Sequence, residues 1–328
     1  MRYALRRTGF FVFTLWAALT LNFLLPRLMP GNPAEAMIAK FHGTLTPAAI
    51  RALDVLFGVN TNQGLWSQYI SYLHQMATLN FGTSLAYYPN SVSSEIGGAI
   101  WWTIGLVGLT TVLAFGLGTL LGIVSAWRRG SRLDSVVPPV FVIASAVPYF
   151  WVAMMLILIF GITMHWFPYE FGYYVTTDKP GLNLTFFQDV ANHAFLPALS
   201  LLVTTIGTWI LTMRNTMVTT LAEDYVRMAR AKGLTGRRIM FDYAARNAIL
   251  PNLTGFAMSL GFVVSGAILI EYVFNYPGIG NMLLYAVNSA DYPLMQALFL
   301  LITVAVLVSI LIADLLTALL DPRTRTAG

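Results

Sequence analysis

The sequence predicts an all-α, polytopic membrane protein with six transmembrane helices and both termini in the cytoplasm. Two observations predict this fold class. The chain of 328 residues is 57% hydrophobic and only 10% charged, with a mean hydropathy of +0.69, whereas ordinary soluble domains carry about 25% charged residues. In addition, six charge-free runs are long enough to cross a bilayer, which takes about 20 residues. Lipid is therefore the expected solvent.

Each of these six runs predicts one transmembrane helix. They lie near residues 8–26, 100–127, 135–164, 194–213, 248–270 and 293–313. The first run is longer than the apolar core of a signal peptide, and no small-residue cleavage site follows it, so we expect an uncleaved helix. The second run is rich in glycine, which either suits close helix contacts or is tolerated in lipid. These glycines are Gly105, Gly108, Gly116, Gly118 and Gly122.

The distribution of basic residues orients these helices. With the N-terminus inside, all but four of the 19 Arg and Lys residues fall in cytoplasmic segments. The four exceptions are Arg27, Lys40, Arg51 and Lys179. Because cytoplasmic loops carry the excess of Lys and Arg, both termini are predicted to be cytoplasmic. The same asymmetry explains the net charge of +5 without a nucleic-acid partner.

Four regions follow from this topology. They are the N-terminal helix (1–29), an external region (30–99), a five-helix core (100–320) with a cytoplasmic loop at 214–247, and a cytoplasmic tail (321–328). In the external region, helical spacing predicts short helices over 46–57 and over Leu65 to Ala77. These helices either rest on the membrane rim or dock an external partner. The aromatic external loop at 165–193 is more typical of a membrane interface than of a ligand-stacking site.

The sequence lacks the motifs of the common catalytic sites. It has no cysteine, no H-E-x-x-H, no G-x-S-x-G and no Gly-Lys pair that could begin a P-loop. We therefore expect no enzyme activity and no cofactor in this chain, and any energy from ATP must come from another polypeptide. No charged residue lies at the middle of a predicted span, which disfavours an ion-coupled carrier.

The loop at 214–247 contains a well-specified short helix. Thr220 and Glu223 fit a capping box, Glu223 and Arg227 are spaced as an i, i+4 pair, and Gly233 fits the left-handed position after a helix. Thr235 can then cap a second helix that leads toward the fifth span. Pro251 is expected either to kink that span or to mark its start.

One face of this short helix is predicted to contact something else. Tyr225, Met228, Ala229 and Lys232 share a face at i, i+3, i+4 and i+7. Short isolated helices are marginal in water. The face therefore either fits a groove in a partner or rests on lipid headgroups, and spacing alone favours neither.

The stretch from Glu223 to Gly233, together with Arg246-Asn247-Ala248-x-Leu250-Pro251, resembles the coupling loop of ABC-transporter permeases. More narrowly, it is similar to the peptide/nickel permease family. Arg227 and Met228 replace the Glu and Ala of the wider superfamily motif, and Pro251 lies eighteen residues beyond Gly233. Both departures are usual in the peptide/nickel branch.

Further segments carry the same resemblance in the same order. They are Pro30-Gly31-Asn32-Pro33, Phe81-Gly82-Thr83-Ser84, Ser145-Ala146-Val147-Pro148-Tyr149-Phe150, Glu271-x-Val273-Phe274-x-x-Pro277-Gly278-x-Gly280 and Asp291-Tyr292-Pro293. Asn32 replaces the Asp of the family, which puts a role for that carboxylate in doubt. The large loop after the first helix marks the B-type subunit.

The resemblance implies a type I ABC importer permease in the plasma (inner) membrane of a bacterium or archaeon. Its implied partners are a second, homologous permease, two ATP-binding subunits or a fused pair that hold ATP and Mg, and an external substrate-binding protein. Implied substrates are di- and oligopeptides, with oligosaccharides or a nickel chelate as alternatives. A self-contained secondary carrier, or a membrane-embedded hydrolase or receptor, is less favoured.

The resemblance also assigns roles to individual residues. The residues that it implies couple the permease to the ATPase are Glu223, Asp224, Tyr225, Arg227, Met228, Ala229, Arg230, Ala231, Lys232, Gly233 and Pro251. Ser145 and Pro148 are candidates for lining the translocation path between the two permeases. For either residue taken alone, helix packing and kinking are the favoured explanation.

Overall fold

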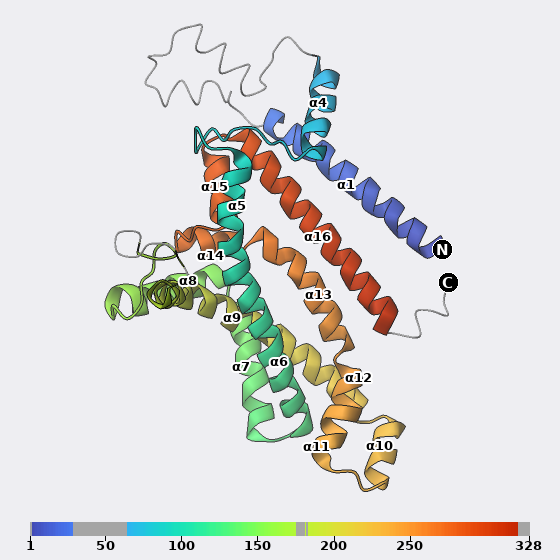
Figure 1. The fold of residues 1–328 in the computed structure, drawn as a ribbon. Helices are drawn as coiled ribbons and strands as arrows, with labels where there is room; N and C mark the ends of the chain where they lie inside the picture. The colour runs from blue at the N-terminus through green and yellow to red at the C-terminus, as the bar shows by residue number, and fades with distance from the viewer. Residues whose placement is uncertain (1, 29–63, 175–180, 182, 321–328) are drawn as a thin grey trace.

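All regular elements of the described chain are helices. The computed structural model describes residues 2–28, 64–174, 181 and 183–320, and within these ranges it contains no strand, only an isolated antiparallel bridge between Thr83 and Ser91 (Figure 1). The predicted all-α class is therefore confirmed for the part of the chain that the structure describes. The helix predicted over 46–57 lies outside the described residues.

Along the chain, α-helices alternate with three π-helical segments, which carry the labels η1 to η3. The order is α1 (Arg2–Leu28), α4 (Leu65–Ala77), α5 (Val92–Thr103), η1 (Ile104–Gly108), α6 (Leu109–Trp127), α7 (Arg132–Ala146), α8 (Tyr149–Leu156), η2 (Ile157–Thr163), α9 (Leu184–Thr220), α10 (Asp224–Ala231), α11 (Gly236–Arg238), η3 (Ile239–Ala245), α12 (Arg246–Ala248), α13 (Leu250–Ser265), α14 (Ile268–Val273), α15 (Ile279–Asn288) and α16 (Tyr292–Leu320). The helix predicted from Leu65 to Ala77 is confirmed as α4.

Four continuous helical stretches in the described residues are long and apolar enough to cross a membrane. They are Val92–Trp127, Leu184–Thr220, Leu250–Val273 and Tyr292–Asp314, and they coincide with the second, fourth, fifth and sixth predicted spans. α1 contains a shorter apolar stretch, Gly9–Leu25. The helix α1 runs antiparallel to α16, and the two helices pack side by side (Figure 1).

The third predicted span, at 135–164, is not one continuous helix. α7 ends at Ala146 and α8 begins at Tyr149, and the two halves are bent by 95°. The cause is Pro148, because the residue before a proline is disfavoured in the helical conformation. Val147 accordingly adopts an extended backbone with φ −82° and ψ 129°.

The glycines in the second predicted span fall into two groups, according to whether an added Cβ atom would meet a neighbouring helix. A Cβ atom at Gly122 would lie 2.7 Å from the carbonyl oxygen of Ile210, and one at Gly118 would lie 2.6 Å from Cβ of Trp209. These two glycines therefore let α6 approach α9 closely. At Gly105 and Gly116 no atom of the described residues lies within 4 Å of an added Cβ, so within this part of the chain the prediction of close packing does not hold at these two positions.

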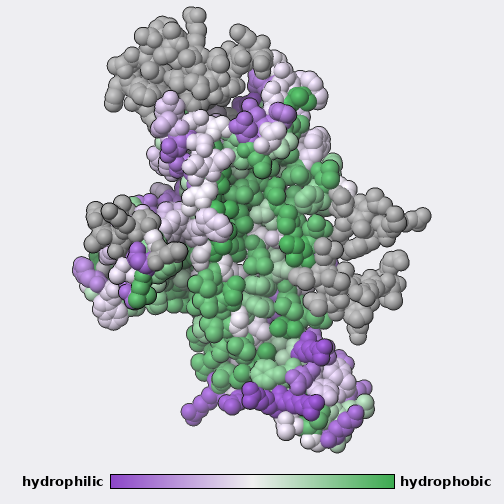
Figure 2. All heavy atoms as spheres, viewed as in Figure 1, coloured by the Kyte–Doolittle hydropathy of each residue, from purple (hydrophilic) through white to green (hydrophobic). Residues whose placement is uncertain are grey.

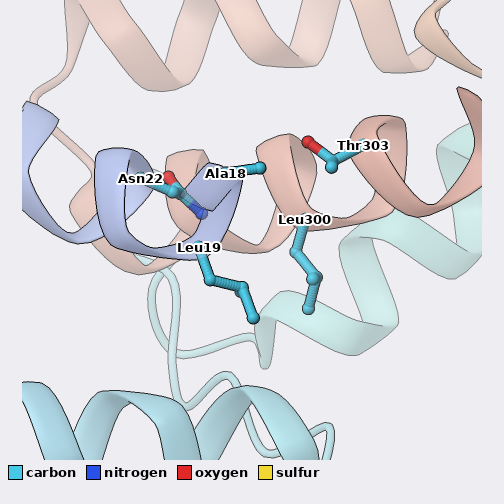
Figure 3. A pocket seen from close by; sticks show the side chains of 5 residues that line it. All are labelled: Ala18, Leu19, Asn22, Leu300 and Thr303. Atoms are coloured by element: carbon cyan, nitrogen blue, oxygen red, sulfur yellow. The ribbon is translucent and has the colours of Figure 1, made fainter. Parts of the chain in front are cut away.

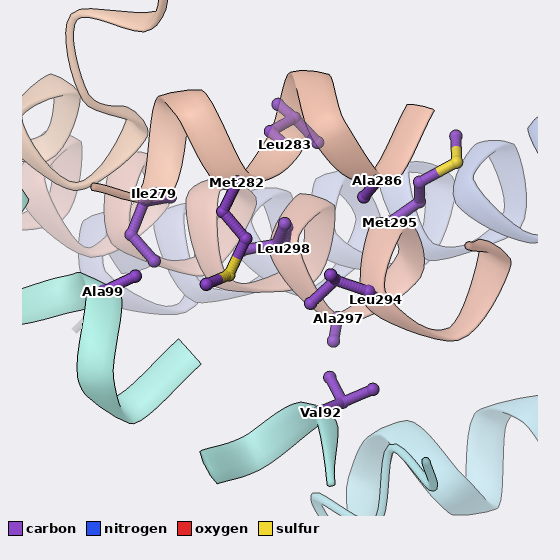
Figure 4. Close-up of a cluster of buried hydrophobic side chains, with 10 residues drawn as sticks. All are labelled: Val92, Ala99, Ile279, Met282, Leu283, Ala286, Leu294, Met295, Ala297 and Leu298. Atoms are coloured by element: carbon purple, nitrogen blue, oxygen red, sulfur yellow. The ribbon is translucent and has the colours of Figure 1, made fainter. Parts of the chain in front are cut away.

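The largest cluster of buried hydrophobic residues joins α5, α15 and α16 (Figure 4). It contains Val92, Ala99, Ile279, Met282, Leu283, Ala286, Leu294, Met295, Ala297 and Leu298. Over the surface of the long helices, hydrophobic residues dominate, while hydrophilic residues gather at the end that carries α10 to α12 and the turn between α6 and α7 (Figure 2). The apolar belt is the surface expected for a protein that spans lipid.

Candidate functional site

The loop at 214–247 folds into a protruding group of short helices beyond the ends of α6 and α9 (Figure 1). α9 ends at Thr220, a turn reverses the chain, and α10 follows from Asp224 to Ala231. The segments α11, η3 and α12 then lead back to α13. The short helix predicted within this loop is confirmed, with Glu223 as its N-cap and Lys232 as its C-cap.

The predicted capping and pairing of this helix are wrong. Thr220 belongs to α9, and its hydroxyl donates to the carbonyl of Thr216 at 2.8 Å. Glu223 has the extended backbone of an N-cap, but its side chain makes no capping bond. The expected pair of Glu223 with Arg227 is also replaced, because Nη1 of Arg227 lies 3.5 Å from Oδ1 of Asp224. Both partners of this ion pair are exposed, so it adds little stability.

Gly233 ends the helix as predicted. Its φ is +72°, in the left-handed region that favours glycine. Its amide donates to the carbonyl of Arg230 at 3.0 Å, and the amide of Leu234 donates to the carbonyl of Ala229 at 3.4 Å. These bonds satisfy carbonyls that the end of a helix leaves unpaired.

The outward face of α10 differs from the one that helical spacing predicts. Ala229, expected on the same face as Tyr225 and Met228, is buried with Val226, whereas Met228 is 60% exposed. Two apolar residues at i and i+3 are enough to fix which side of so short a helix packs inward. The exposed residues of the segment are Glu223, Asp224, Tyr225, Arg227, Met228, Arg230, Ala231, Lys232 and Gly233. The outward surface is thus polar and mostly basic, with one exposed methionine.

Pro251 marks the start of the following long helix. It occupies the first turn of α13, where its missing amide hydrogen costs nothing. Of the two roles expected for this proline, the structure supports the start of the helix rather than a kink within it.

Two small hydrophobic clusters support α10. In the first, Val226 and Ala229 pack with Ile239 of η3, and Trp127 at the end of α6 packs against them. The second joins the ends of α6 and α9 to η3 and α12. It contains Ile123, Ala126, Met213, Met217, Ala244, Ala245 and Ala248. α10 therefore rests on η3, which itself packs on α6 and α9.

Two polar contacts near this site were not predicted from the sequence. Nδ2 of Asn247 donates to Oη of Tyr225 at 2.9 Å, which joins α12 to α10. Arg214 of α9 binds Asp134 of α7 through both carboxylate oxygens, with 2.9 Å between Nη2 and Oδ2. The residues of each pair are 22 and 80 positions apart, so no local pattern in the sequence reveals them.

Ser145 and Pro148 occupy the bend region between α7 and α8. The hydroxyl of Ser145 donates to the carbonyl of Phe141 at 2.7 Å, and a Cβ atom at Gly207 of α9 would clash with that hydroxyl oxygen. Pro148 is exposed at the N-cap of α8. Both residues thus have packing or bending roles here, and their place in a translocation path stays a prediction.

Several of the segments that carry the family resemblance meet in space around two buried carboxylates. Glu271 accepts hydrogen bonds from Thr103 Oγ1 at 2.8 Å and from the amide of Gly280 at 2.6 Å. Asp291 accepts bonds from the hydroxyl of Ser84 and from the amide of Ala86 at 2.9 Å. Glu271 of α14 joins the end of α5 to the first turn of α15. Asp291 joins the loop before α5 to the first turn of α16, so these motif residues hold separate elements of the fold together.

A small pocket lies between α1 and α16 (Figure 3). Ala18, Leu19, Asn22, Leu300 and Thr303 line it, and its empty volume is about 150 Å³. Sites for small molecules are typically about 300–1,000 Å³. This pocket is therefore too small to hold a peptide.

Comparison with known proteins finds one matching family and several similar permeases. The sequence pattern of the family described as "Binding-protein-dependent transport system inner membrane component" matches residues 118–326. The chain is 32% identical over 332 residues to the di/tripeptide transport system permease protein DppB of Pseudomonas aeruginosa, covering 98% of this chain and 97% of the relative. It is 31% identical to the dipeptide transport system permease protein DppB of Lactococcus lactis, covering 99% of each chain. It is also 31% identical to the oligopeptide transport system permease protein AppB of Bacillus subtilis, covering 98% of each chain.

Proposed function

Because the chain belongs to the family of binding-protein-dependent transport system inner membrane components, we propose that it is the permease subunit of an ATP-driven importer of di- and oligopeptides. The observation that carries this proposal is the near-full-length similarity to three permeases named for peptide transport. The family places the protein in the inner membrane, where its apolar helices cross the bilayer several times.

The proposed topology has six spans and cytoplasmic termini. Under this proposal α1 is the first span, and α7, α8 and η2 together form a bent third span. The start of α1 and the end of α16 lie at the same end of the antiparallel pair (Figure 1), which supports placing both termini on one side. The exposed basic residues of α10 support placing α10 to α12 in the cytoplasm as well.

We further propose that α10 is the docking element for one ATP-binding subunit. Its outward side presents Arg227, Arg230 and Lys232, which suit an acidic groove, and the exposed Met228 supplies an adaptable apolar contact. ATP and Mg bind on the partner, and this chain contributes no catalytic group. The two ATP-binding subunits close together on ATP, and α10 carries that motion to α9 and α13.

The complete importer contains further partners. A second, homologous permease forms the other half of the translocation path, and an external binding protein delivers the peptide. The family description, which names a binding-protein-dependent system, supports the external binding protein. The second permease rests on the resemblance of the sequence to the peptide/nickel permeases.

Purification and reconstitution test the proposal. The tagged chain, extracted gently from its native membrane, is expected to bring with it a sister permease and an ATP-binding subunit. In proteoliposomes with the co-purified binding protein, a labelled dipeptide should enter only when ATP is supplied on the cytoplasmic side. Uptake by this chain alone in response to an ion gradient would instead establish a secondary carrier. If ATP-driven uptake is found for an oligosaccharide or a nickel chelate but not for a peptide, that compound would take the place of peptide as the proposed substrate.

Charge reversal on α10 tests the docking surface. Arg227→Glu combined with Arg230→Glu should reduce co-purification of the ATP-binding subunit by about tenfold, because like charges at an interface are strongly unfavourable. Arg132→Glu is the matched control, since Arg132 is exposed at the same end of the molecule but lies on α7. An equal loss in both variants would contradict docking through α10.

A further inference from the structure

The short helix α10 packs against the end of α6, although α6 is not its neighbour along the chain. Trp127 is the last residue of α6, and it packs against the buried side of α10 formed by Val226 and Ala229, together with Ile239. A Cβ atom at Gly236 would lie 3.2 Å from Cζ2 of Trp127. The indole therefore lies directly against the backbone that follows α10.

A hydrogen bond also joins α10 to α12. Nδ2 of Asn247 donates to Oη of Tyr225 at 2.9 Å, and the same amide group lies 3.3 Å from the carbonyl oxygen of Tyr243. α10 thus contacts both the end of α6 and the segment formed by η3 and α12.

The three long helices next to these contacts, α6, α9 and α13, are tightly joined to one another. α6 and α9 approach closely at Gly122, and Nδ2 of Asn252 in α13 donates to Thr119 Oγ1 of α6 at 3.0 Å. The same amide group lies 3.3 Å from the carbonyl oxygen of Trp209 in α9. The ends of α6, α9 and α13 therefore form one packed unit.

We propose that Trp127 and the Asn247–Tyr225 hydrogen bond are positioning contacts that fix α10 to this unit, so that a displacement of α10 moves α6 together with α9 and α13. This inference rests on the proposed function and extends the transmission of motion to α6. Chain turns lie on both sides of α10, at 221–223 and at Gly233. Without side contacts these turns would let α10 tilt alone, since coupling between sites travels through packed side chains and hydrogen bonds.

The first test measures peptide imported for each ATP hydrolysed by the assembled transporter. Trp127→Ala should lower this ratio about fivefold, while Trp127→Phe, which keeps a ring, should lower it by less than about twofold. Tyr225→Phe and Asn247→Ala each remove the hydrogen bond and should lower the ratio about twofold. Trp16→Ala is the matched control, because Trp16 is an exposed tryptophan on α1. Co-purification of the ATP-binding subunit is followed throughout and should stay unchanged in Trp127→Ala, Trp127→Phe and Asn247→Ala, whose residues lie outside the docking surface.

The second test measures the attachment without transport. The chain contains no cysteine, so spin labels can be placed at Arg132→Cys beside α6 and at Met228→Cys on α10 in the full chain in lipid nanodiscs. The distance distribution between the labels should be narrow in the parent and clearly broader with Trp127→Ala or Tyr225→Phe.

Unchanged import per ATP in Trp127→Ala, Tyr225→Phe and Asn247→Ala, together with an unchanged label distribution, overturns the inference. If Trp127→Ala is not recovered from the membrane, the Tyr225→Phe and Asn247→Ala results decide by the same criterion. Failure of the proposed function is distinguishable, because the parent transporter would then show no ATP-driven uptake. The label distances would still report whether α10 is held to α6.

Discussion

Gly233 shows how a single residue determines the shape of the exposed loop. With φ at +72°, Gly233 turns the chain out of α10. Its own amide and that of Leu234 then donate to carbonyls of the last turn of the helix. Nothing would clash with a Cβ atom here. The requirement for glycine is therefore conformational rather than steric.

Gly233→Val should uncouple transport from ATP hydrolysis while the protein stays in the membrane. A β-branched residue in the left-handed region costs about 1–2 kcal/mol, which the loop relieves by changing the direction of α10. The measurement is ATP-driven uptake in proteoliposomes with equal amounts of protein. Gly233→Asn is the matched control, since asparagine tolerates this conformation, and it should retain most of the uptake. Full uptake by the valine variant would contradict this role.

Glu271 is the second residue whose surroundings make a sharp prediction. Its buried carboxylate accepts bonds from Thr103 and Gly280, and removing it leaves these donors unpaired. Glu271→Ala should destabilise the protein by about 3 kcal/mol, as measured by the midpoint of thermal unfolding in detergent. Glu170→Ala, at an exposed position, should leave the midpoint unchanged. Equal midpoints for the two variants would show that the bonds to Glu271 contribute nothing.

At the scale of single elements, the packing of α6 on α9 is a close helix contact set by two glycines. Gly118 and Gly122 are spaced four residues apart and lie on one side of α6, where their missing side chains admit the backbone of α9. Gly116, two residues from Gly118, points away from this contact.

Gly122→Leu should force α6 and α9 apart and destabilise the protein by about 3 kcal/mol. Gly116→Leu has the same change in helix propensity and size, but its site is open, so it should be nearly neutral in the solubilised subunit. Thermal unfolding of both variants in the same detergent decides the matter. A larger loss from Gly116→Leu than from Gly122→Leu would refute the assignment of the contact.

The bend in the third predicted span is an element that hydropathy could not reveal. The run at 135–164 is apolar throughout, so its composition predicts a single helix. Pro148 was noted as a possible kink, but a proline within an apolar run is compatible with either a mild kink or a complete break. The structure shows a complete break, with an extended backbone at Val147 before Pro148 and a 95° bend between α7 and α8.

At the scale of the whole molecule, the proposed topology can be tested directly on a cysteine-free chain. Single cysteines at Arg128 and Met228 should react with a membrane-impermeant maleimide only from the cytoplasmic side. Cysteines at Tyr88 and Trp166 should react only from the outside. All four side chains are exposed. Reaction at Met228 from the outside would contradict the placement of α10.

The sequence by itself determined the helical class, the positions of most spans, the helix after Glu223 and the glycine that ends it. Hydropathy, helix-end residues and φ preferences are local properties, so they can be read along the chain. It could not determine which side of α10 packs inward, the partner of Arg227, the break at Pro148 or the contacts of Trp127, Asn247 and Asp134. The contacts of Trp127, Asn247 and Asp134 and the buried side of α10 depend on residues far apart in the sequence, which only tertiary packing brings together. The pairing of Arg227 with Asp224 and the break at Pro148 are local, but more than one local arrangement fits the same residue pattern.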